Sequence, residues 1–437
     1  MFHLNSAPVE PTPALRRSAE RKATGSAVFG AMGDVTLTDS AVIILFAQRI
    51  GAGDMFSMLT TSLMPLFNGF CVIIMAWLAQ RLGYRRLIIQ SCILSVIAYL
   101  LIVCTPFLGS GSLPVVMLIS LMLIFSVLHT AYVAGWFPLL DTFLTQERRG
   151  PYLSTMRFSW QLSSATFLFL AGLFIGKEPP LWKLQVVLLT GALLFSGRIF
   201  FIGAIPDFVV QRQDSFGFAD GLRRALANKP LVGYSAYLFI LNLAAYGTLP
   251  LTTIYLKKHL MAPDNVIVMI SAVTLVGMLL GSLTAGRVIA RWGIRNTLLF
   301  IHITYTLVNC ALFFISEGRP LTYALVTLLL LLYSITFAMS SIATTYEMMA
   351  LATPGNKAMA MAFCVTLYSS GSGLSRLFSS LLLGSGLLAP TWYIGSTQVC
   401  HYQSLFLLYA VALVIAAMFL VIVPAVFPRG DYHYEKH

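Results

Sequence analysis

Charged residues are scarce in this sequence. Asp, Glu, Lys and Arg together make up 10% of its 437 residues, whereas 58% of the residues are hydrophobic. A folded chain of this composition has too few charges to cover its surface in water. The composition therefore excludes an ordinary soluble protein and favours one that lies in a membrane.

Sequence signals of catalysis and of cofactor binding are also missing. There is no Gly-x-x-x-x-Gly-Lys-Ser/Thr loop, so ATP is not an evident energy source. There is no His-rich cluster and no nucleophile with a base at a suitable spacing, which argues against an intramembrane enzyme. We therefore expect neither an enzyme nor a bound cofactor.

The six cysteines indicate neither a disulfide framework nor a metal site. Five of them lie inside apolar stretches, where cysteine behaves as a small apolar residue, and Cys400 has no evident partner. A cleavable signal peptide is not visible either. Residues 1–22 are polar and basic, and the apolar stretch after them is too long for such a signal. We expect residues 1–22 to form a disordered cytoplasmic tail.

Long apolar stretches, by contrast, fill the chain. A hydrocarbon core of roughly 30 Å needs about 20 apolar residues per helix, and the stretches are too long and continuous for the strands of a membrane barrel. The sequence therefore predicts an all-α membrane protein with twelve transmembrane helices. The predicted spans are 23–48, 55–79, 87–107, 113–141, 151–175, 182–205, 231–256, 265–290, 297–316, 320–348, 358–388 and 402–427.

The placement of the basic residues predicts the topology. Of the 28 Lys and Arg residues, 18 fall in the predicted inner loops and tails, six in the outer loops and four within helices. Positive charge gathers on the cytoplasmic side of membrane proteins, so both termini are expected there. This bias explains the net charge of +12 without a nucleic-acid partner. The expected location is the plasma membrane, as a multi-pass protein of a bacterial inner membrane.

A long inner loop, residues 206–230, divides the chain into an N-terminal bundle at 23–205 and a C-terminal bundle at 231–428. Residues 429–437 form a second cytoplasmic tail. Within the loop, residues 216–226 fit either a short amphipathic helix on the inner leaflet or a plain connector.

Two of the polar joints between the apolar stretches are near-copies at a constant offset of 210 positions (291 − 81). Arg81, Gly83 and Arg85 correspond in this way to Arg291, Gly293 and Arg295. At the same offset, Ala52-Gly53-Asp54 corresponds to Ala262-Pro263-Asp264. Membrane proteins built from two related halves usually move one half against the other around a central site. The repeat therefore predicts a transporter.

The repeated joint resembles the signature loop of the major facilitator superfamily, approximately Gly-x-x-x-Asp-Arg-x-Gly-Arg-Arg between helices 2 and 3, with a weaker copy between helices 8 and 9. The first copy has Ala76, Gln80 and Tyr84 at three of the signature positions, and the second keeps Gly286 but has Ala290 at the acidic one. The resemblance implies two pseudo-symmetric six-helix bundles around a central cavity, which helices 1, 4, 7 and 10 would line.

The inner ends of the helices carry a candidate cytoplasmic gate. The repeated arginines and glycines can latch the cytoplasmic side by binding helix ends or a carboxylate, or they can simply anchor the topology. Asp141 and Arg157 lie at similar depth on neighbouring helices. We expect them to form an ion pair that is structural or part of the gate.

Ionisable side chains inside spans are costly and are functional candidates by default. Asp34 and Asp39 lie in helix 1, and Glu347 lies near the inner end of helix 10. All three are candidates for proton coupling, although Asp34 or Asp39 can instead cap a helix and Glu347 can pair with Lys357. We expect Arg198 to pair with Asp207 or to reach the interface. Arg376 can hold an anionic group of a substrate or close the outer gate against an acid.

Polar and aromatic residues share helix faces in helices 4, 7 and 10, and either contact a substrate or pack. These candidates are His129, Tyr132, Trp136, Asn242, Tyr246, Ser340 and Thr344. Such a lining suits an uncharged or amphiphilic organic substrate. We therefore expect a monomeric secondary active transporter that moves a small organic solute by alternating access, coupled to protons. A transporter-like lipid scramblase or a membrane sensor or scaffold is the alternative.

Overall fold

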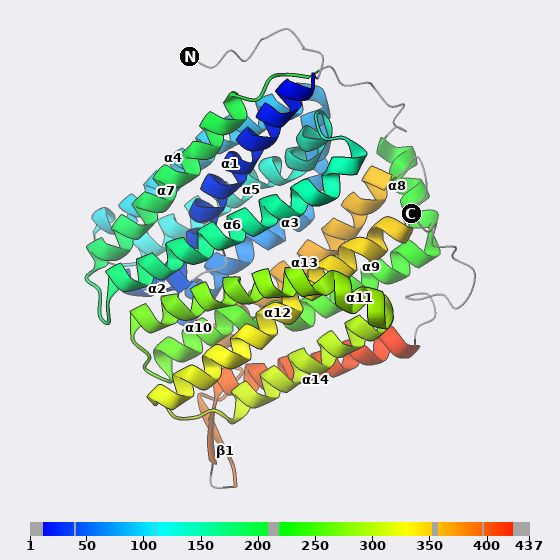
Figure 1. The fold of residues 1–437 in the computed structure, drawn as a ribbon. Helices are drawn as coiled ribbons and strands as arrows, with labels where there is room; N and C mark the ends of the chain where they lie inside the picture. Colours follow the sequence, from blue (N-terminus) through cyan, green and yellow to red (C-terminus); the bar gives the residue numbers. More distant parts are fainter. Residues whose placement is uncertain are drawn as a thin grey trace.

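The computed structural model describes residues 12–38, 41–109, 111–208, 218–351, 357–395 and 397–422. Helices make up nearly all of this part of the chain, and they form two groups that lie side by side (Figure 1). The first group, the N half, consists of α1 (Pro13–Leu37), α2 (Ala41–Arg49), α3 (Asp54–Leu82), α4 (Tyr84–Cys104), the short 3-10 helix η1 (Thr105–Leu108), α5 (Leu113–Asp141), α6 (Gln146–Ile175) and α7 (Leu181–Gly203). The second group, the C half, consists of α8 (Phe218–Ala227), α9 (Lys229–Ala245), α10 (Thr248–Lys258), α11 (Asp264–Phe314), α12 (Pro320–Leu351), α13 (Lys357–Ser385), the strands β1 (Thr391–Ile394) and β2 (Thr397–Cys400), and α14 (His401–Ile422).

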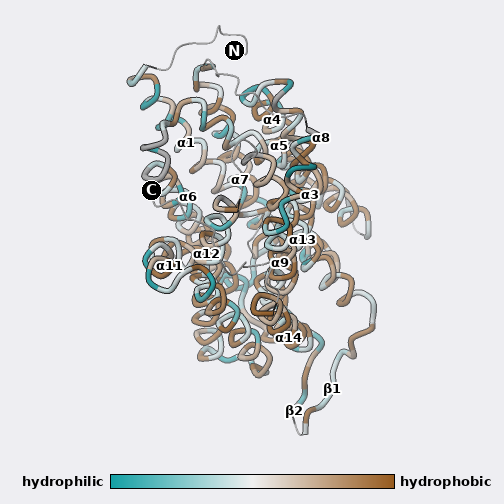
Figure 2. The backbone as a smooth tube through the Cα atoms, turned by 90° about the vertical axis from the view of Figure 1, so that its right-hand side faces the viewer, coloured by the Kyte–Doolittle hydropathy of each residue, from teal (hydrophilic) through white to brown (hydrophobic). Residues whose placement is uncertain are grey.

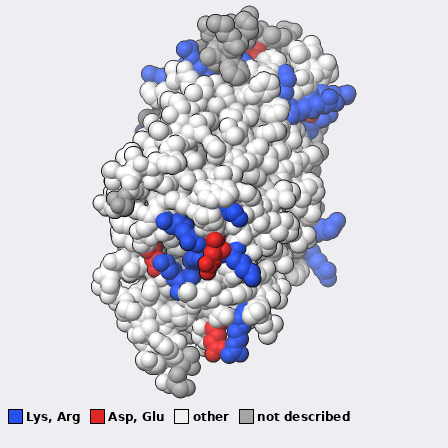
Figure 3. All heavy atoms as spheres, turned by 90° about the vertical axis from the view of Figure 1, so that its left-hand side faces the viewer, with Lys and Arg blue, Asp and Glu red and all other residues white. Residues whose placement is uncertain are grey.

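The predicted helical membrane protein is confirmed. Among the described residues, nine helices are long and apolar enough to span a membrane, or ten if the bent pair α1 and α2 forms one span. Apolar residues run along α9, α13 and α14 in Figure 2. Figure 3 shows charged side chains gathered in compact patches, with a wide uncharged surface between them. A multi-pass membrane protein follows, whereas the number of twelve spans stays a prediction.

The 51 residues of α11 would measure about 77 Å as one helix, more than twice the hydrocarbon core. Gly293, with a φ of 75°, interrupts it at the second copy of the repeated joint. Gly83, the matching residue of the first copy, has a φ of 88° between α3 and α4. A side chain is strained at such a φ, so both joints require glycine at this position. We call the end of the molecule with these two joints the inner end, following the predicted topology, and the opposite end the outer end.

Two predicted spans are each built from two helices. The span expected at 23–48 consists of α1 and α2, which are bent by 41° relative to each other, and the span expected at 231–256 consists of α9 and α10. The second break lies at Tyr246 and Gly247. Subtracting the repeat offset of 210 gives positions 36 and 37, which is where α1 ends. The breaks therefore occupy corresponding positions in the two halves.

Residues 13–22, which were expected to belong to a disordered tail, form the start of a helix instead. Residues 13–22 show no apolar pattern, but α1 begins at Pro13 because Thr12 caps it. The Thr12 hydroxyl accepts a hydrogen bond from the Leu15 amide at 3.4 Å. Glu20 in this segment also pairs with Arg148 at 2.6 Å. Residues 1–11, and the tail predicted at 429–437, lie outside the described residues.

Two further elements lie near the loops. The amphipathic helix suggested around residues 216–226 is present as α8, and it packs against α9 and α13. The antiparallel hairpin of β1 and β2, with Thr391 opposite Cys400, has no counterpart in the sequence-based prediction, which continued the preceding helix to residue 388.

The halves meet along two pairs of helices, α3 with α13 and α6 with α11. These are corresponding elements exchanged between the halves, as expected for two pseudo-symmetric bundles. Small residues allow close approach: Gly69 of α3 lies against Ser370, and Gly373 of α13 lies against the backbone of Leu66. The small residues of α13 therefore serve packing between the halves in this structure.

Candidate functional site

A cluster of buried charged side chains lies inside the N half, between α1, α5 and α7. Arg198 of α7 donates a hydrogen bond from Nη2 to Oδ2 of Asp34 of α1 at 2.6 Å. Nε2 of His129, from α5, lies 3.3 Å from the other carboxylate oxygen, Oδ1. Arg198 is 2% exposed and His129 is 7% exposed. The three side chains therefore form one network inside the membrane-spanning part of the protein; we call it the charge cluster.

Aromatic rings and a glycine hold Arg198 in place. Its guanidinium lies over the ring of Tyr132 at 3.9 Å and over that of Phe195 at 4.7 Å. Such cation–π contacts stabilise a cation in an apolar surrounding. Gly30 of α1 faces the guanidinium, which would overlap any Cβ atom at that position. The sequence thus provides a tight cavity for this cation.

An aromatic ladder runs along α5 beside the charge cluster. Successive ring centroids are 5.9 Å apart between Phe125 and His129, 5.6 Å between His129 and Tyr132, and 5.3 Å between Tyr132 and Trp136. The predicted polar-aromatic face of helix 4 therefore exists. Tyr132 is 8% and Trp136 4% exposed, and the ring of Tyr132 contacts Arg198 of α7 in the same half.

Several polar atoms in this region have no hydrogen-bond partner among the described residues. They are Oδ1 of Asp34, both ring nitrogens of His129 and Nε1 of Trp136. His129 and Asp34 face each other at ion-pair distance, but their geometry does not make a hydrogen bond. Buried polar atoms without partners are rare in folded proteins and call for an explanation such as a catalytic or transport role.

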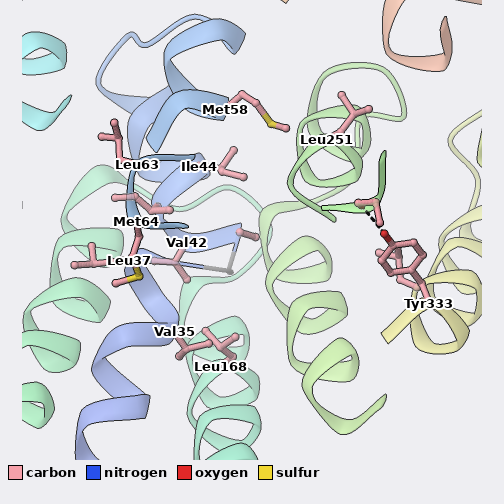
Figure 4. Packing of buried hydrophobic residues seen from close by; sticks show 14 of the residues in the cluster. Val35, Leu37, Val42, Ile44, Met58, Leu63, Met64, Leu168, Leu251 and Tyr333 are labelled. Atoms are coloured by element: carbon pink, nitrogen blue, oxygen red, sulfur yellow. Dashed lines mark hydrogen bonds between the residues drawn. The ribbon is translucent and has the colours of Figure 1, made fainter. Parts of the chain in front are cut away.

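The two helix breaks lie next to one another across the interface between the halves. Thr38 at the end of α1, Thr61 of α3 and Thr253 of α10 line a void of about 10 Å³, which is room for a single water at most. Figure 4 shows apolar side chains of α1, α2 and α3 packed around the first break, with Leu251 of α10 across from them. The interface is therefore closed at this level.

Arg376 of α13 joins the two halves at the same void. Its Nη1 donates to the carbonyl of Thr61 at 2.7 Å, and its Nε donates to the carbonyl of Tyr246 at 3.2 Å. The side chain is buried. Of the two roles considered for Arg376, this position fits a gate, although the partners described here are backbone carbonyls rather than a carboxylate.

The outer ends of the halves are held together by charged and polar contacts. Asp264, the first residue of α11, is fully buried and pairs with Arg49 of α2 at 3.2 Å and with Lys257 of α10. We call these three residues the outer latch. Asp54, which corresponds to Asp264 in the repeat, begins α3 and accepts a hydrogen bond from Tyr402 of α14. Both repeated aspartates thus connect one half to the other.

The candidate residues of the C half lie apart from the charge cluster. Tyr246 is half-buried, and its ring contacts those of Phe337 at 4.9 Å and Tyr368 at 5.6 Å. Asn242 is buried, and its side-chain amide donates a hydrogen bond to the carbonyl of Leu238 in its own helix at 2.6 Å. This is a common local contact within a helix. On α12, Ser340 is half-buried and Thr344 is buried.

Two other candidates for proton coupling differ in what the structure shows. Glu347 is 3% exposed, and its Oε2 has no hydrogen-bond partner among the described residues. Asp39 lies outside the described residues. Asp34 is therefore the one carboxylate of the three that the structure places in a charged network.

At the inner end, Arg85 makes the contacts that the repeated joint suggested. It donates to the carbonyls of Ile202 and Gly203 at the end of α7, at 3.4 Å and 2.5 Å, and to Oδ2 of Asp207 at 2.7 Å. A cation suits the negative end of a helix dipole. Asp207 therefore pairs with Arg85, and the suggested pair of Asp207 with Arg198 is wrong.

The remaining gate candidates make fewer contacts. Arg81 lies over the ring of Trp77 at 4.0 Å. Arg291 is exposed and Arg295 is half-buried at the second joint, on the α11 side of the molecule. The ion pair expected between Asp141 and Arg157 is not among those that the structure shows between described residues.

Sequence reasoning missed the partners in both charged networks. It offered Arg198 either Asp207 or the interface, and it counted Arg49 and Lys257 only among the six cations of the outer loops. The available signals were an arginine in helix 6 at a depth similar to that of Asp34, and the repeat of Asp54 at Asp264. A groove of about 420 Å³ between α11 and α14, lined mainly by apolar residues, also went unpredicted and lies away from the charge cluster.

Comparisons with known proteins agree with this architecture. The model of the Major Facilitator Superfamily matches residues 24–375. Among solved structures, a mutant of the nucleoside transporter NupG has a TM-score of 0.71 at 14% identity, covering 94% of this chain and 100% of that one. A bacterial homologue of the human lysosomal transporter Spinster, inward-facing and unoccupied, has a TM-score of 0.65 at 15% identity, covering 94% and 97%. No curated protein sequence matches. At such identities the structural likeness shows the fold alone.

Proposed function

Since this chain belongs to the major facilitator superfamily, we propose that it is a secondary active transporter that moves a small organic solute by alternating access, coupled to protons. The observation that carries this proposal is the charge cluster, whose Asp34 lies within four residues of the break at the end of α1. Ionisable groups inside a membrane protein mark ion and substrate pathways, and paired helix breaks in two halves point to the binding site.

The arrangement of the halves supports alternating access. The outer latch, the contacts of Arg376 and the hydrogen bond from Ser380 to the carbonyl of Met55, at 2.7 Å, close the outer end. At the inner end, by contrast, the first repeated joint is held by contacts within its own half, where Arg85 donates to the end of α7. We infer that the structure represents a state closed toward the outside, and that transport requires these outer contacts to break.

The solute class follows from the side chains near the breaks. Tyr246, Phe337 and Tyr368 offer half-buried rings from the C half, and Ser340 offers a hydroxyl. Rings with polar tips suit an uncharged or amphiphilic organic molecule. We propose that this solute contacts these residues from the C half and the charge cluster from the N half.

The alternative functions gain no support from the structure. A lipid scramblase needs a path from the bilayer into the space between the halves, whereas α3 with α13 and α6 with α11 pack along both seams. We therefore propose transport alone, in the plasma membrane and with both termini in the cytoplasm.

Counterflow tests this function directly. Purified protein in proteoliposomes, loaded with one unlabelled solute at a time from a panel of small organic molecules, should concentrate the same solute in labelled form from outside. Liposomes without protein give the background. Uptake at background level for every solute of a panel that covers sugars, nucleosides, amino acids and amphiphilic aromatics would count against transport of a small organic solute.

A further inference from the structure

The charge cluster contains two groups able to exchange a proton, Asp34 and His129, and the proposed function does not say which of them does so. We propose that His129 carries the coupling proton, and that Asp34 and Arg198 form a permanently charged pair that positions it. This assignment rests on the proposed proton-coupled transport. The sequence analysis instead named Asp34 as one of three candidate carboxylates for proton coupling.

The contacts of Asp34 argue against its being the carrier. Arg198 stays protonated in proteins, and its Nη2 donates to Asp34 Oδ2 at 2.6 Å. The guanidinium is 2% exposed. A proton on Asp34 would leave this buried cation without a counter-charge, which is strongly unfavourable. The carboxylate is therefore held in its charged form by its partner.

The surroundings of His129 argue for the opposite behaviour. Imidazole is the side chain that titrates near physiological pH when unperturbed. Nε2 of His129 faces Oδ1 of Asp34 at 3.3 Å, and Oδ1 has no hydrogen-bond partner among the described residues. A proton on Nε2 would turn this contact into a charge-assisted hydrogen bond. The site is thus prepared to receive one proton at His129.

No second carboxylate contacts His129 among the residues that the structure describes. Asp34 faces it from α1, and Arg198 of α7 contacts the other carboxylate oxygen of Asp34. On α3, Asn68 accepts a hydrogen bond from Thr130, beside His129, and does not titrate. Further titratable neighbours of the cluster, in the described part of the chain, are thiol and phenol groups: Cys92 and Tyr99 of α4, Tyr132 of α5 and Tyr152 of α6.

The proton balance is simple. A hydronium ion or a buffer acid gives up its proton, and a new N–H bond forms at Nε2 of His129. The summed charge of the three side chains changes from zero to plus one. The side chain of Asp34 is 18% exposed, so water can reach the cluster at this residue. When the proton leaves, it returns to water on the side to which the cluster is then open.

This proton is placed to influence the break in helix 1. Asp34 precedes the end of α1 by one helical turn, and the hydroxyl of Thr38 donates to the Asp34 carbonyl at 2.9 Å. The following helix, α2, ends at Arg49 of the outer latch. Protonation of His129 therefore strengthens its attraction to Asp34, and Asp34 lies one helical turn before the break that leads to α2 and the outer latch.

A measurement without any solute tests the assignment. Spin labels at Glu178→Cys and Leu387→Cys, on exposed outer loops of the two halves, report the distance across the outer end by pulsed electron resonance. The six native cysteines are replaced by alanine. We expect the distance distribution to change when the pH is lowered from alkaline to acidic values in this background, because His129 then receives its proton.

His129→Asn and His129→Gln should both remove this pH response, whereas the matched control His302→Asn should keep it. His302 is also a buried intramembrane histidine, but its Nδ1 donates a hydrogen bond to the Leu298 carbonyl in its own helix. A pH response that persists in both His129 variants overturns the assignment and leaves proton coupling standing. No pH response in the parent protein overturns the assignment and the coupling together, while counterflow still decides whether solute is transported.

The permanently charged pair of Asp34 and Arg198 has a separate test, and its outcome does not depend on the role of His129. Asp34→Asn leaves Arg198 charged and without its carboxylate partner. The melting temperature of this variant in detergent should therefore lie several degrees below that of the parent protein. The double variant Asp34→Asn with Arg198→Gln removes both charges and should recover part of this loss. If Asp34→Asn alone melts at the parent temperature, Asp34 does not carry a fixed charge and the proposal fails.

Discussion

The outer latch gives a quantitative prediction for the change between outer-closed and outer-open states. Arg49 Nη2 and Asp264 Oδ2 are 3.2 Å apart, and the pair joins α2 of the N half to α11 of the C half. Asp264 is fully buried, but the side chain of Arg49 is 36% exposed. Solvent therefore screens the pair, and its loss should cost about 1 kcal/mol rather than the several kcal/mol of a fully buried pair.

Arg49→Ala removes this contact and leaves the rest of the outer end intact. Because 1 kcal/mol corresponds to about a factor of five in an equilibrium, the ratio of outer-open to outer-closed molecules should rise about fivefold. The spin-label pair at Glu178→Cys and Leu387→Cys measures this ratio as the weight of the longer distance. The pH is held constant, so that the charge cluster does not contribute.

The matched control is Arg319→Ala. Arg319 pairs with Glu317 at 2.6 Å within the loop between α11 and α12, so this surface pair joins no part of the N half. Its loss should leave the ratio unchanged. In a second comparison, Arg49→Ala is made in an Asp264→Asn background, where it should have no further effect. An equal shift in that background, or an equal shift in the control, would refute the latch.

Two glycines supply further predictions, checked by thermal melting in detergent with Gly286→Ala as the shared control. Gly30→Ala should lower stability by about 1–3 kcal/mol, because the added methyl group overlaps the guanidinium of Arg198. Gly83→Ala should cost about 1–2 kcal/mol, because its φ of 88° strains any side chain although the surrounding space is open. Gly286 lies within α11 in open space, so alanine there should be neutral or stabilising. A melting temperature equal to that of the control would contradict the reasoning for either variant.

Much of the fold could be predicted because apolar length and small turn residues are local signals. The span expected at 113–141 coincides with α5, and the repeated joints at Gly83 and Gly293 mark turns in both halves. The breaks in the first and seventh spans could not be predicted in this way. Apolar residues lie on both sides of each break, so hydropathy averaged over a whole span joins the two helices into one.

The pairing of charges could not be predicted for a different physical reason. Which acid Arg198 meets depends on how α7 is rotated against α1, and a helix that is apolar on nearly every side gives no amphipathic pattern to fix that rotation. The outer latch depends on how the halves pack, which involves residues more than 200 positions apart, as Arg49 and Asp264 are. The repeat of the aspartate indicated that the position matters but did not identify its partner.

The most direct test of coupled transport is accumulation of a solute against its gradient. Proteoliposomes with a solute identified by counterflow are given a pH gradient across the membrane and no solute gradient. We expect the labelled solute to become unequally distributed across the membrane, with a direction that reverses when the pH gradient is reversed, and a protonophore should abolish the difference. A solute that exchanges across the membrane but stays evenly distributed under either pH gradient would contradict the account.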